Sequence, residues 1–162
     1  MENLYMINIG GSTEKSNIEV HDILFVVAES IEQTYELVKQ SWYGTKTSLH
    51  IDSYKILREV NGCKIELSEV NNEDNLYMLT YGGHKPGEFS ESHRIHFVVS
   101  KSTSEAKLQG ETDIHNYDYM DHVDEICDIQ KVLLGSNKFV SLVKCDTSFD
   151  ETPDWSGYIK LF

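Results

Sequence analysis

The chain reads EVHDILFVV over Glu19–Val27, and 72 residues later it reads ESHRIHFVV over Glu91–Val99. In a β-strand, alternate residues point to the same face of the sheet. Taken in this way, one face carries Glu, His, Ile, Phe and Val in the same order in both stretches. The opposite face differs at most of its positions. A face that is kept while its reverse changes is typical of a buried face, so we expect Phe25 and Phe97 to be buried.

The similarity extends well beyond these two stretches. Without a gap, residues 3–60 match residues 75–132 at 16 positions, where chance would give roughly three or four. Each half predicts the order strand, strand, helix, strand, strand. We therefore expect an α+β fold of two tandem ββαββ repeats related by a pseudo-twofold axis, similar in element order to a ubiquitin-like roll. The expected boundaries are 1–72 for the first repeat, 73–145 for the second and 146–162 for a C-terminal acidic loop and extra strand.

Local signals predict where the first elements of each half begin and end. Opening strands are expected over 4–9 and 76–81, and each is followed by a glycine pair that favours a turn or bulge. An S-x-x-E/Q pattern at Ser30 and at Ser102 predicts the N-terminus of a helix in each half. Gly110 predicts that the second helix ends early and is the shorter one.

A strand pair is expected to close each half. In the first half, Ile51–Val60 and Cys63–Val70 flank Asn61-Gly62, which is a strong signal for a two-residue hairpin turn. In the second half the corresponding strands are Val123–Leu133 and Phe139–Cys145. A final strand at Trp155–Phe162 follows an acidic loop, and we expect it to cover an open sheet edge.

Several aromatic residues have no counterpart in the other half. They fill the seam between the halves or anchor a partner protein, because Trp and Tyr are favoured at interfaces. These residues are Trp42, Tyr43, Trp155 and Tyr158.

The composition excludes some classes of partner. The formal net charge is −13 and the pI is near 4.8, so phosphate backbones and anionic lipids are repelled, and we expect neither nucleic acid nor membrane as a partner. No apolar run is long enough to span a bilayer, and the N-terminus has no secretory signal pattern. The three cysteines form neither a disulfide framework nor a metal-binding pair, which indicates a reducing, cytoplasmic setting.

Three motifs together resemble the bacterial domain of unknown function DUF1543. They are the Leu-Tyr and Gly-Gly pairs within 4–11, the stretch Glu19–Val27, and the sequence LHIDSY at 49–54. The resemblance covers about residues 17–67 and, less closely, 90–140, where Arg94 stands in place of Asp22. Domains of this family occur once or twice in a chain, which implies a tandem, bacterial, intracellular protein. The resemblance implies no activity.

Polar residues recur in both halves as candidate ligands. Alternation places Glu19 and His21 on one strand face, and His50 and Asp52 on one face of another strand. If these strands are neighbours, four side chains converge. The set invites three interpretations: a structural hydrogen-bond network, a transition-metal or ligand site, and acid/base catalysis. In the second half, the counterparts with the same residue types are Glu91, His93, His122 and Asp124.

Asp22 follows His21 in the first half only, so a site confined to that half would use Asp22 as well. No nucleophile motif is present, and we assign no catalytic residue. The sequence therefore favours a small non-enzymatic binding or interaction module, with a protein partner or a homodimer as its assembly. The alternative is an enzyme that uses a metal or a His/Asp acid–base pair on a small molecule. The cofactor is either absent or a transition metal.

Overall fold

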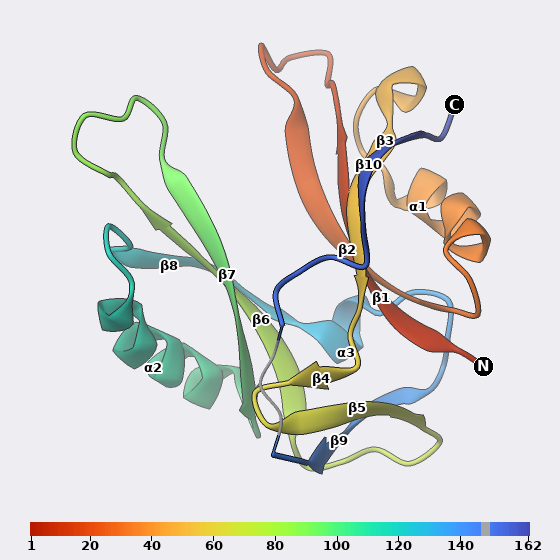
Figure 1. Ribbon diagram of the computed structural model, residues 1–162, viewed down its shortest axis with the longest axis vertical. Coiled ribbons are helices and arrows are strands. Elements are labelled where there is room, and N and C mark those ends of the chain that lie inside the picture. Colours follow the sequence, from red (N-terminus) through yellow and green to blue (C-terminus); the bar gives the residue numbers. More distant parts are fainter. Residues whose placement is uncertain (147–149) are drawn as a thin grey trace. The chain divides into compact units, whose positions relative to one another are not determined.

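The structure is a computed structural model that describes residues 1–146 and 150–162, so residues 147–149 of the expected acidic loop lie outside the described residues. It is a mixed α+β fold, as the sequence predicts, and its strands form three antiparallel sheets (Figure 1). The chain divides into two compact units. The first contains Met1–Glu59, Val132–Lys138 and the described C-terminal segment, and the second contains Val60–Lys131 and the segment from residue 139 to residue 146. Among the described helices, none is both long and apolar enough to cross a bilayer.

The first unit is built on a four-stranded sheet. Its strands lie in the order β10 (Trp155–Lys160), β3 (His50–Ile56), β1 (Asn3–Gly11) and β2 (Val20–Ala28). A 3-10 turn at Glu32–Thr34 leads into α1 (Tyr35–Ser41), and a second turn at Lys46–Ser48 leads into β3. Because β10 pairs with the edge strand β3, the expected final strand covers that sheet edge.

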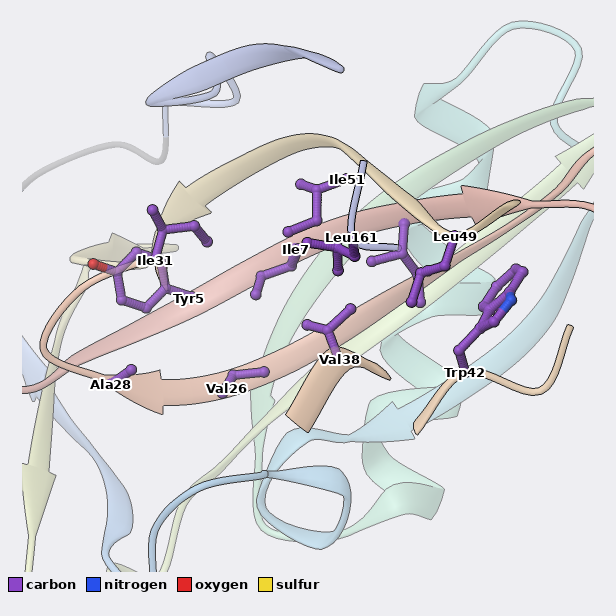
Figure 2. Close-up of a cluster of buried hydrophobic side chains, with 11 residues drawn as sticks. Tyr5, Ile7, Val26, Ala28, Ile31, Val38, Trp42, Leu49, Ile51 and Leu161 are labelled. Carbon is purple, nitrogen blue, oxygen red and sulfur yellow. The ribbon is translucent and has the colours of Figure 1, made fainter. Parts of the chain in front are cut away.

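The core of this unit lies between one face of the sheet and α1 (Figure 2). Tyr5, Ile7 and Ile9 alternate along β1 and contribute three of its side chains. Val38 and Trp42, on and just after α1, pack against them. Trp42, which has no counterpart in the other half, is therefore a core residue of the first unit.

The second unit contains a sheet with the same central arrangement. Its strands lie in the order β7 (Ser92–Ser100), β6 (Asn75–Gly83) and β8 (His122–Asp128). Helix α2 (Thr103–Asp113) continues into a 3-10 turn at Ile114–Asn116 and packs on this sheet around Leu79 and Tyr81. The remaining sheet has the strands β4 (Glu59–Val60), β5 (Cys63–Ser68) and β9 (Phe139–Lys144).

The two larger sheets pair their strands in the same register, displaced by 72 residues. Gly10 lies opposite His21 on β2 and opposite His50 on β3. In the second unit, Gly82 lies in the same way between His93 and His122. Of the two expected structures, the turn is wrong, since Gly10-Gly11 and Gly82-Gly83 are the final residues of the strands β1 and β6. A register shift of the β-bulge type does occur just before each pair, between Asn8 and Ile9 and between Thr80 and Tyr81.

The predicted helix starts have different outcomes. Ser102 is the N-cap of α2, because its side chain accepts a hydrogen bond from the Glu105 N–H. Ser30 is not an N-cap: the turn at Glu32–Thr34 and α1 both begin later, without a side-chain cap. The expected early end at Gly110 is also wrong. Gly110 lies inside α2, where an added Cβ would be 2.2 Å from Leu79 Cδ2, so this glycine permits close helix–sheet packing.

The strand pairs that follow are only partly as expected. Asn61 and Gly62 have φ of 49° and 72° and form the predicted tight turn between β4 and β5. The expected strand Val123–Leu133 instead ends at Asp128, whose carboxylate accepts a hydrogen bond from the Gln130 N–H and caps the short helix α3 (Ile129–Val132). β9 pairs with β5 rather than with β8.

Phe25 and Phe97 are 1% and 3% exposed, which confirms the prediction made from their strand face.

Candidate functional site: two histidine–carboxylate clusters

The strand register brings four polar side chains of the first unit together. Since Gly10 lies directly between His21 and His50, their two imidazoles share one sheet face above it. Glu19 precedes His21 by two residues, and Asp52 follows His50 by two, so alternation adds both carboxylates to this face. We call this set, Glu19, His21, His50 and Asp52, the first cluster.

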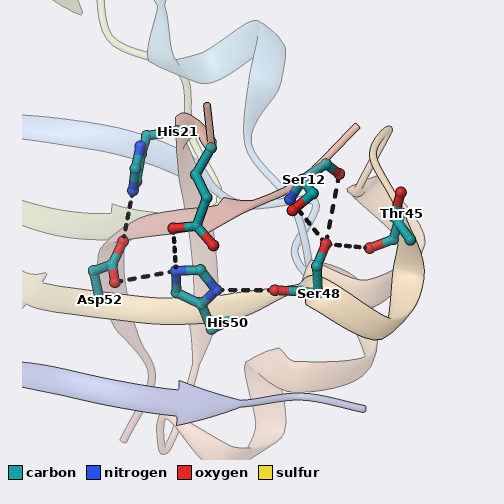
Figure 3. A network of polar contacts seen from close by, with 7 residues as sticks. Ser12, His21, Thr45, Ser48, His50 and Asp52 are labelled. Atoms are coloured by element: carbon teal, nitrogen blue, oxygen red, sulfur yellow. Dashed lines mark hydrogen bonds and ion pairs between the residues drawn. The ribbon is translucent and has the colours of Figure 1, made fainter. Parts of the chain in front are cut away.

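Asp52 bridges the two histidines (Figure 3). His21 Nε2 is 3.2 Å from Asp52 Oδ2, and His50 Nε2 is 3.3 Å from Asp52 Oδ1. Glu19 Oε2 is 3.9 Å from His50 Nε2. Glu19, His21 and His50 each offer a nitrogen or oxygen ligand atom, and these atoms lie within 4.8 Å of one another.

His50 is held in one orientation. The residue is 1% exposed, and its Nδ1 lies 2.9 Å from the backbone oxygen of Ser48. A carbonyl oxygen can only accept a hydrogen bond, so Nδ1 carries the proton. In the neutral ring, Nε2 therefore directs its lone pair at the carboxylates of Asp52 and Glu19. This arrangement is favourable only when a proton or a cation lies between them.

The Ser48 carbonyl is itself fixed by a small network (Figure 3). The Ser48 hydroxyl accepts a hydrogen bond from the Ser12 N–H at 2.8 Å and donates one to the Thr45 oxygen at 2.7 Å. These bonds tie the 3-10 turn at Lys46–Ser48 to the end of β1. The backbone group that orients His50 therefore belongs to a segment held by its own hydrogen bonds.

Gly10 forms the floor of the first cluster. A Cβ at this position would lie 2.8 Å from His21 Nε2 and 2.8 Å from His50 Nε2, which is too close for any side chain. Glycine thus lets both imidazoles lie close to the backbone of β1. Sequence reasoning missed this role, although the signal was present: the glycine pair recurs at the same 72-residue spacing as the histidines.

One oxygen of the first cluster lacks a hydrogen bond. Asp52 Oδ2 is buried and has no hydrogen-bond partner, because its contact with His21 meets the distance of an ion pair but not the geometry of a hydrogen bond. Buried polar oxygens are usually satisfied. An unsatisfied carboxylate oxygen beside two imidazoles marks a place where a cation fits.

Asp22 does not join the first cluster. It lies opposite Ile9 rather than Gly10, so strand alternation turns it to the other face of the sheet. Its carboxylate accepts a hydrogen bond from the Ile23 N–H at 2.7 Å. It also lies near Tyr43, where burial, followed by the Asp22 charge, raises the pKa of the Tyr43 phenol.

The second unit assembles a second cluster from Glu91, His93, His122 and Asp124. His122 Nε2 is 2.8 Å from Asp124 Oδ1 and 3.3 Å from Glu91 Oε1. His93 Nε2 is 3.5 Å from both carboxylates. Gly82 forms the floor, since an added Cβ would be 2.6 Å from Asp124 Oδ2 and 2.8 Å from His122 Nε2.

The two clusters differ in what surrounds the inner histidine. The side chain of His50 is 2% exposed, whereas that of His122 is 49% exposed. His122 Nδ1 lies 2.5 Å from the Asp121 carboxylate, and this hydrogen bond raises the pKa of His122. The ring of Tyr158, on β10, stacks on His50 with centroids 4.4 Å apart.

Comparisons with known proteins place this architecture in a family. A family model described as Domain of Unknown Function (DUF1543) matches residues 16–67, a range that contains the whole first cluster. The solved structure described as "Crystal structure of a protein Il1583 from Idiomarina loihiensis" is similar to this chain, with a TM-score of 0.78, 31% sequence identity and coverage of 99% of each chain. A search of curated proteins gives no match. With its family motifs and a relative that similar over its whole length, the chain belongs to the DUF1543 family.

Proposed function

We propose that this protein is a non-enzymatic binding module that holds a divalent transition-metal ion at the first cluster. The observation that carries the proposal is the orientation of His50. Its Nδ1 donates a hydrogen bond to the Ser48 carbonyl, and its Nε2 is buried and points to two carboxylates. Metal-binding histidines are commonly oriented in this way, with the second ring nitrogen donating to a carbonyl or carboxylate.

The ligand chemistry favours zinc. Two imidazole nitrogens and carboxylate oxygens are common zinc ligands, and they also suit iron, nickel and manganese. In this arrangement His21 and His50 supply nitrogen, and Asp52 and Glu19 supply oxygen. The unsatisfied Asp52 oxygen and the close approach of both imidazoles above Gly10 support a cation at this position.

A purely structural network is the competing explanation. Without a cation, the contacts of His50 Nε2 with Asp52 and Glu19 require a buried proton, carried by the imidazole or by a carboxyl group. Burying a charge is costly unless it is well paired, and the contact with Glu19 is long, at 3.9 Å. The proposed ion replaces that proton and engages all four side chains.

We propose further that the two clusters descend from one duplicated ββαββ unit. The shared strand registers, displaced by 72 residues, support this origin. So does the recurrence of a glycine floor with two histidines and two carboxylates. The differences after β3 and β8, where a short strand in one half corresponds to α3 in the other, are later changes on this proposal.

Metal analysis and titration test the proposed ion. Protein purified without an affinity tag is stripped with chelator and titrated with Zn²⁺, and the histidine side-chain NMR signals identify the site that binds. We expect the signals of His21 and His50 to shift together at a saturating stoichiometry. His21→Ala should abolish this event.

Asp22→Ala is the matched control, because Asp22 is the neighbour of His21 on the opposite sheet face and should leave binding intact. The proposal is wrong if neither Zn²⁺ nor Mn²⁺, Fe²⁺ or Ni²⁺ shifts the two histidines. It is equally wrong if Asp22→Ala is as damaging as His21→Ala.

A further inference from the structure

In the four-stranded sheet of the first unit, the outer edge of β3 pairs with an additional strand, β10. In the first unit it pairs antiparallel with β3, with Trp155 opposite Tyr54 and Lys160 opposite His50. Its inward side chains complete the core: Leu161 is 8% exposed and clusters with residues of α1 and β3. β10 and the residues that follow it thus close the space between the helix and the edge strand.

The second unit offers the same edge without such a strand. β8 occupies the position of β3, in the same register with the central strand. Within 1–146 and 150–162, no strand pairs with the outer edge of β8. A cavity of about 630 Å³ lies beside this edge, lined by α2 residues including Lys107 and Glu111, by Asp121 and by the first five residues of β8, up to Ile126.

The exposure of His122 is a second indication that the outer edge of β8 lacks an added strand. Tyr158 of β10 stacks on His50 and contributes to its burial. The corresponding ring, His122, is 49% exposed. The difference in burial between the two inner histidines thus follows the presence and absence of an added strand.

We infer that the outer edge of β8 binds an extended segment of a partner protein, which pairs antiparallel as a further strand and carries apolar residues alternating with lysine or arginine. Strand addition supplies backbone hydrogen bonds, and alternate side chains supply specificity. The apolar residues enter the cavity beside α2, as Leu161 and Ile159 do in the first unit.

The negative charge near the β8 edge explains why the partner segment should carry lysine or arginine. The cavity and edge carry the carboxylates of Glu111, Asp121, Asp124 and Glu125. Their one lysine, Lys107, is already 3.7 Å from Glu111. On the other face, the position that Tyr158 holds in the first unit would lie beside His122 and its acidic neighbours. A cation there is favourable. A second copy of this chain is a poorer occupant, since its own β10 already pairs within its first unit.

A peptide based on the β10 sequence tests the inference. The probe is a fluorescent peptide of residues 154–162 in which Asp154, Ser156 and Tyr158 are each replaced by lysine, so that lysines alternate with the inward-facing residues. It is titrated into the full chain in the presence of chelator, which makes the outcome independent of the proposed metal. We expect saturable binding, with amide NMR shifts confined to β8 and α2.

Two control peptides separate strand addition from simple charge attraction. Placing proline at the position of Ile159 removes a backbone donor and should weaken binding by about tenfold or more. Replacing the lysines with glutamates should abolish binding. In the protein, Glu125→Lys changes no residue of either cluster and lies on the sheet face that the lysines of the peptide would meet, so it should weaken binding of the lysine peptide.

Three results would each overturn the inference. The first is no binding of the lysine peptide. The second is equal binding of the proline peptide, which would show charge attraction alone. The third is a set of shifts on β3, which would mean that the peptide displaces β10 in the first unit.

Discussion

The phenol ring of Tyr158 lies stacked on the imidazole of His50, with ring centroids 4.4 Å apart and planes inclined by 28°. Tyr158 is otherwise largely exposed, so this contact is its main packing role. Through it, a strand contributed by the C-terminal segment covers a histidine of the first cluster.

Removing the Tyr158 ring should loosen His50. We expect Tyr158→Ala to lower the free energy of unfolding by about 0.5–1.5 kcal/mol, the usual contribution of an aromatic pair beyond its buried area, and to weaken Zn²⁺ binding. Tyr158→Phe keeps the stacked ring and should behave like the wild-type chain. Urea melts and Zn²⁺ titrations measure the two effects, and a Phe variant as impaired as the Ala variant would show that the hydroxyl, not the ring, matters.

Adding a methyl group to the floor of a cluster should displace its ligands. We expect Gly10→Ala to abolish the joint Zn²⁺ shift of His21 and His50, because the new Cβ would lie 2.8 Å from both Nε2 atoms. The cost in stability should be about 1–3 kcal/mol, as for other overpacked sites. Gly82→Ala is the matched change in the second cluster and should leave the first cluster's titration unaltered.

Gly110 gives a prediction whose sign is unusual. In an exposed helix interior, Gly→Ala stabilises by about 1 kcal/mol. Here the added Cβ would be 2.2 Å from Leu79 Cδ2, in a core where Leu79 has no exposed surface. We therefore expect Gly110→Ala to destabilise the chain by about 1–3 kcal/mol in chemical denaturation. In a Leu79→Ala background, which removes the clash, the same change should cost far less.

Tyr81 should make stability depend on alkaline pH. Burial, followed by the nearby Asp113 charge, raises the pKa of Tyr81 to about 12, and its hydroxyl donates to the Gly110 oxygen. The folded chain therefore holds this proton more tightly than the unfolded chain. The resulting stability is fully present below the unfolded pKa of about 10 and is lost as the pH rises toward 12.

Comparison with Tyr81→Phe isolates this effect from other groups that titrate at high pH. Near pH 9 the wild-type chain should be the more stable, by about 1 kcal/mol for the lost hydrogen bond. The difference should shrink or reverse near about pH 11. A constant difference between the two chains across this range would contradict the prediction.

The sequence predicts the elements whose signals are local or repeated. The Asn61-Gly62 turn and the Ser102 cap depend on residues a few positions apart, and the structure confirms them. The face prediction for Glu19–Val27 holds for Phe25, which is buried, but not for His21, which is exposed. The core of the first unit takes Val26 from the opposite face of β2. Alternation also predicts which members of the first cluster share a face, given neighbouring strands. The same alternation explains why the prediction that Asp22 joins the first cluster is wrong: Asp22 is adjacent to His21, so its side chain faces the other side of the sheet.

Other features depend on contacts that no local pattern records. The apolar run after Asp128 suits a strand or a helix equally well, and the Asp128 cap decides for the helix α3. The pairing of β5 with β9 joins segments far apart in the sequence. Glycine is common at helix termini, which is why Gly110 predicts a helix end. Its actual role is to allow close packing against Leu79, which precedes it by 31 residues.

The first unit is built from segments at both ends of the sequence, and this has a consequence for its biosynthesis. Its sheet takes β1, β2 and β3 from the start of the chain but β10 from beyond the second unit's sequence. A ribosome delivers these pieces in order, so β3 keeps a bare edge while the whole second unit is being synthesised. During that interval His50 has no Tyr158 above it and the core has no Leu161. The first unit to emerge is thus the last to be completed, and for that period its β3 edge is open to pairing with other chains.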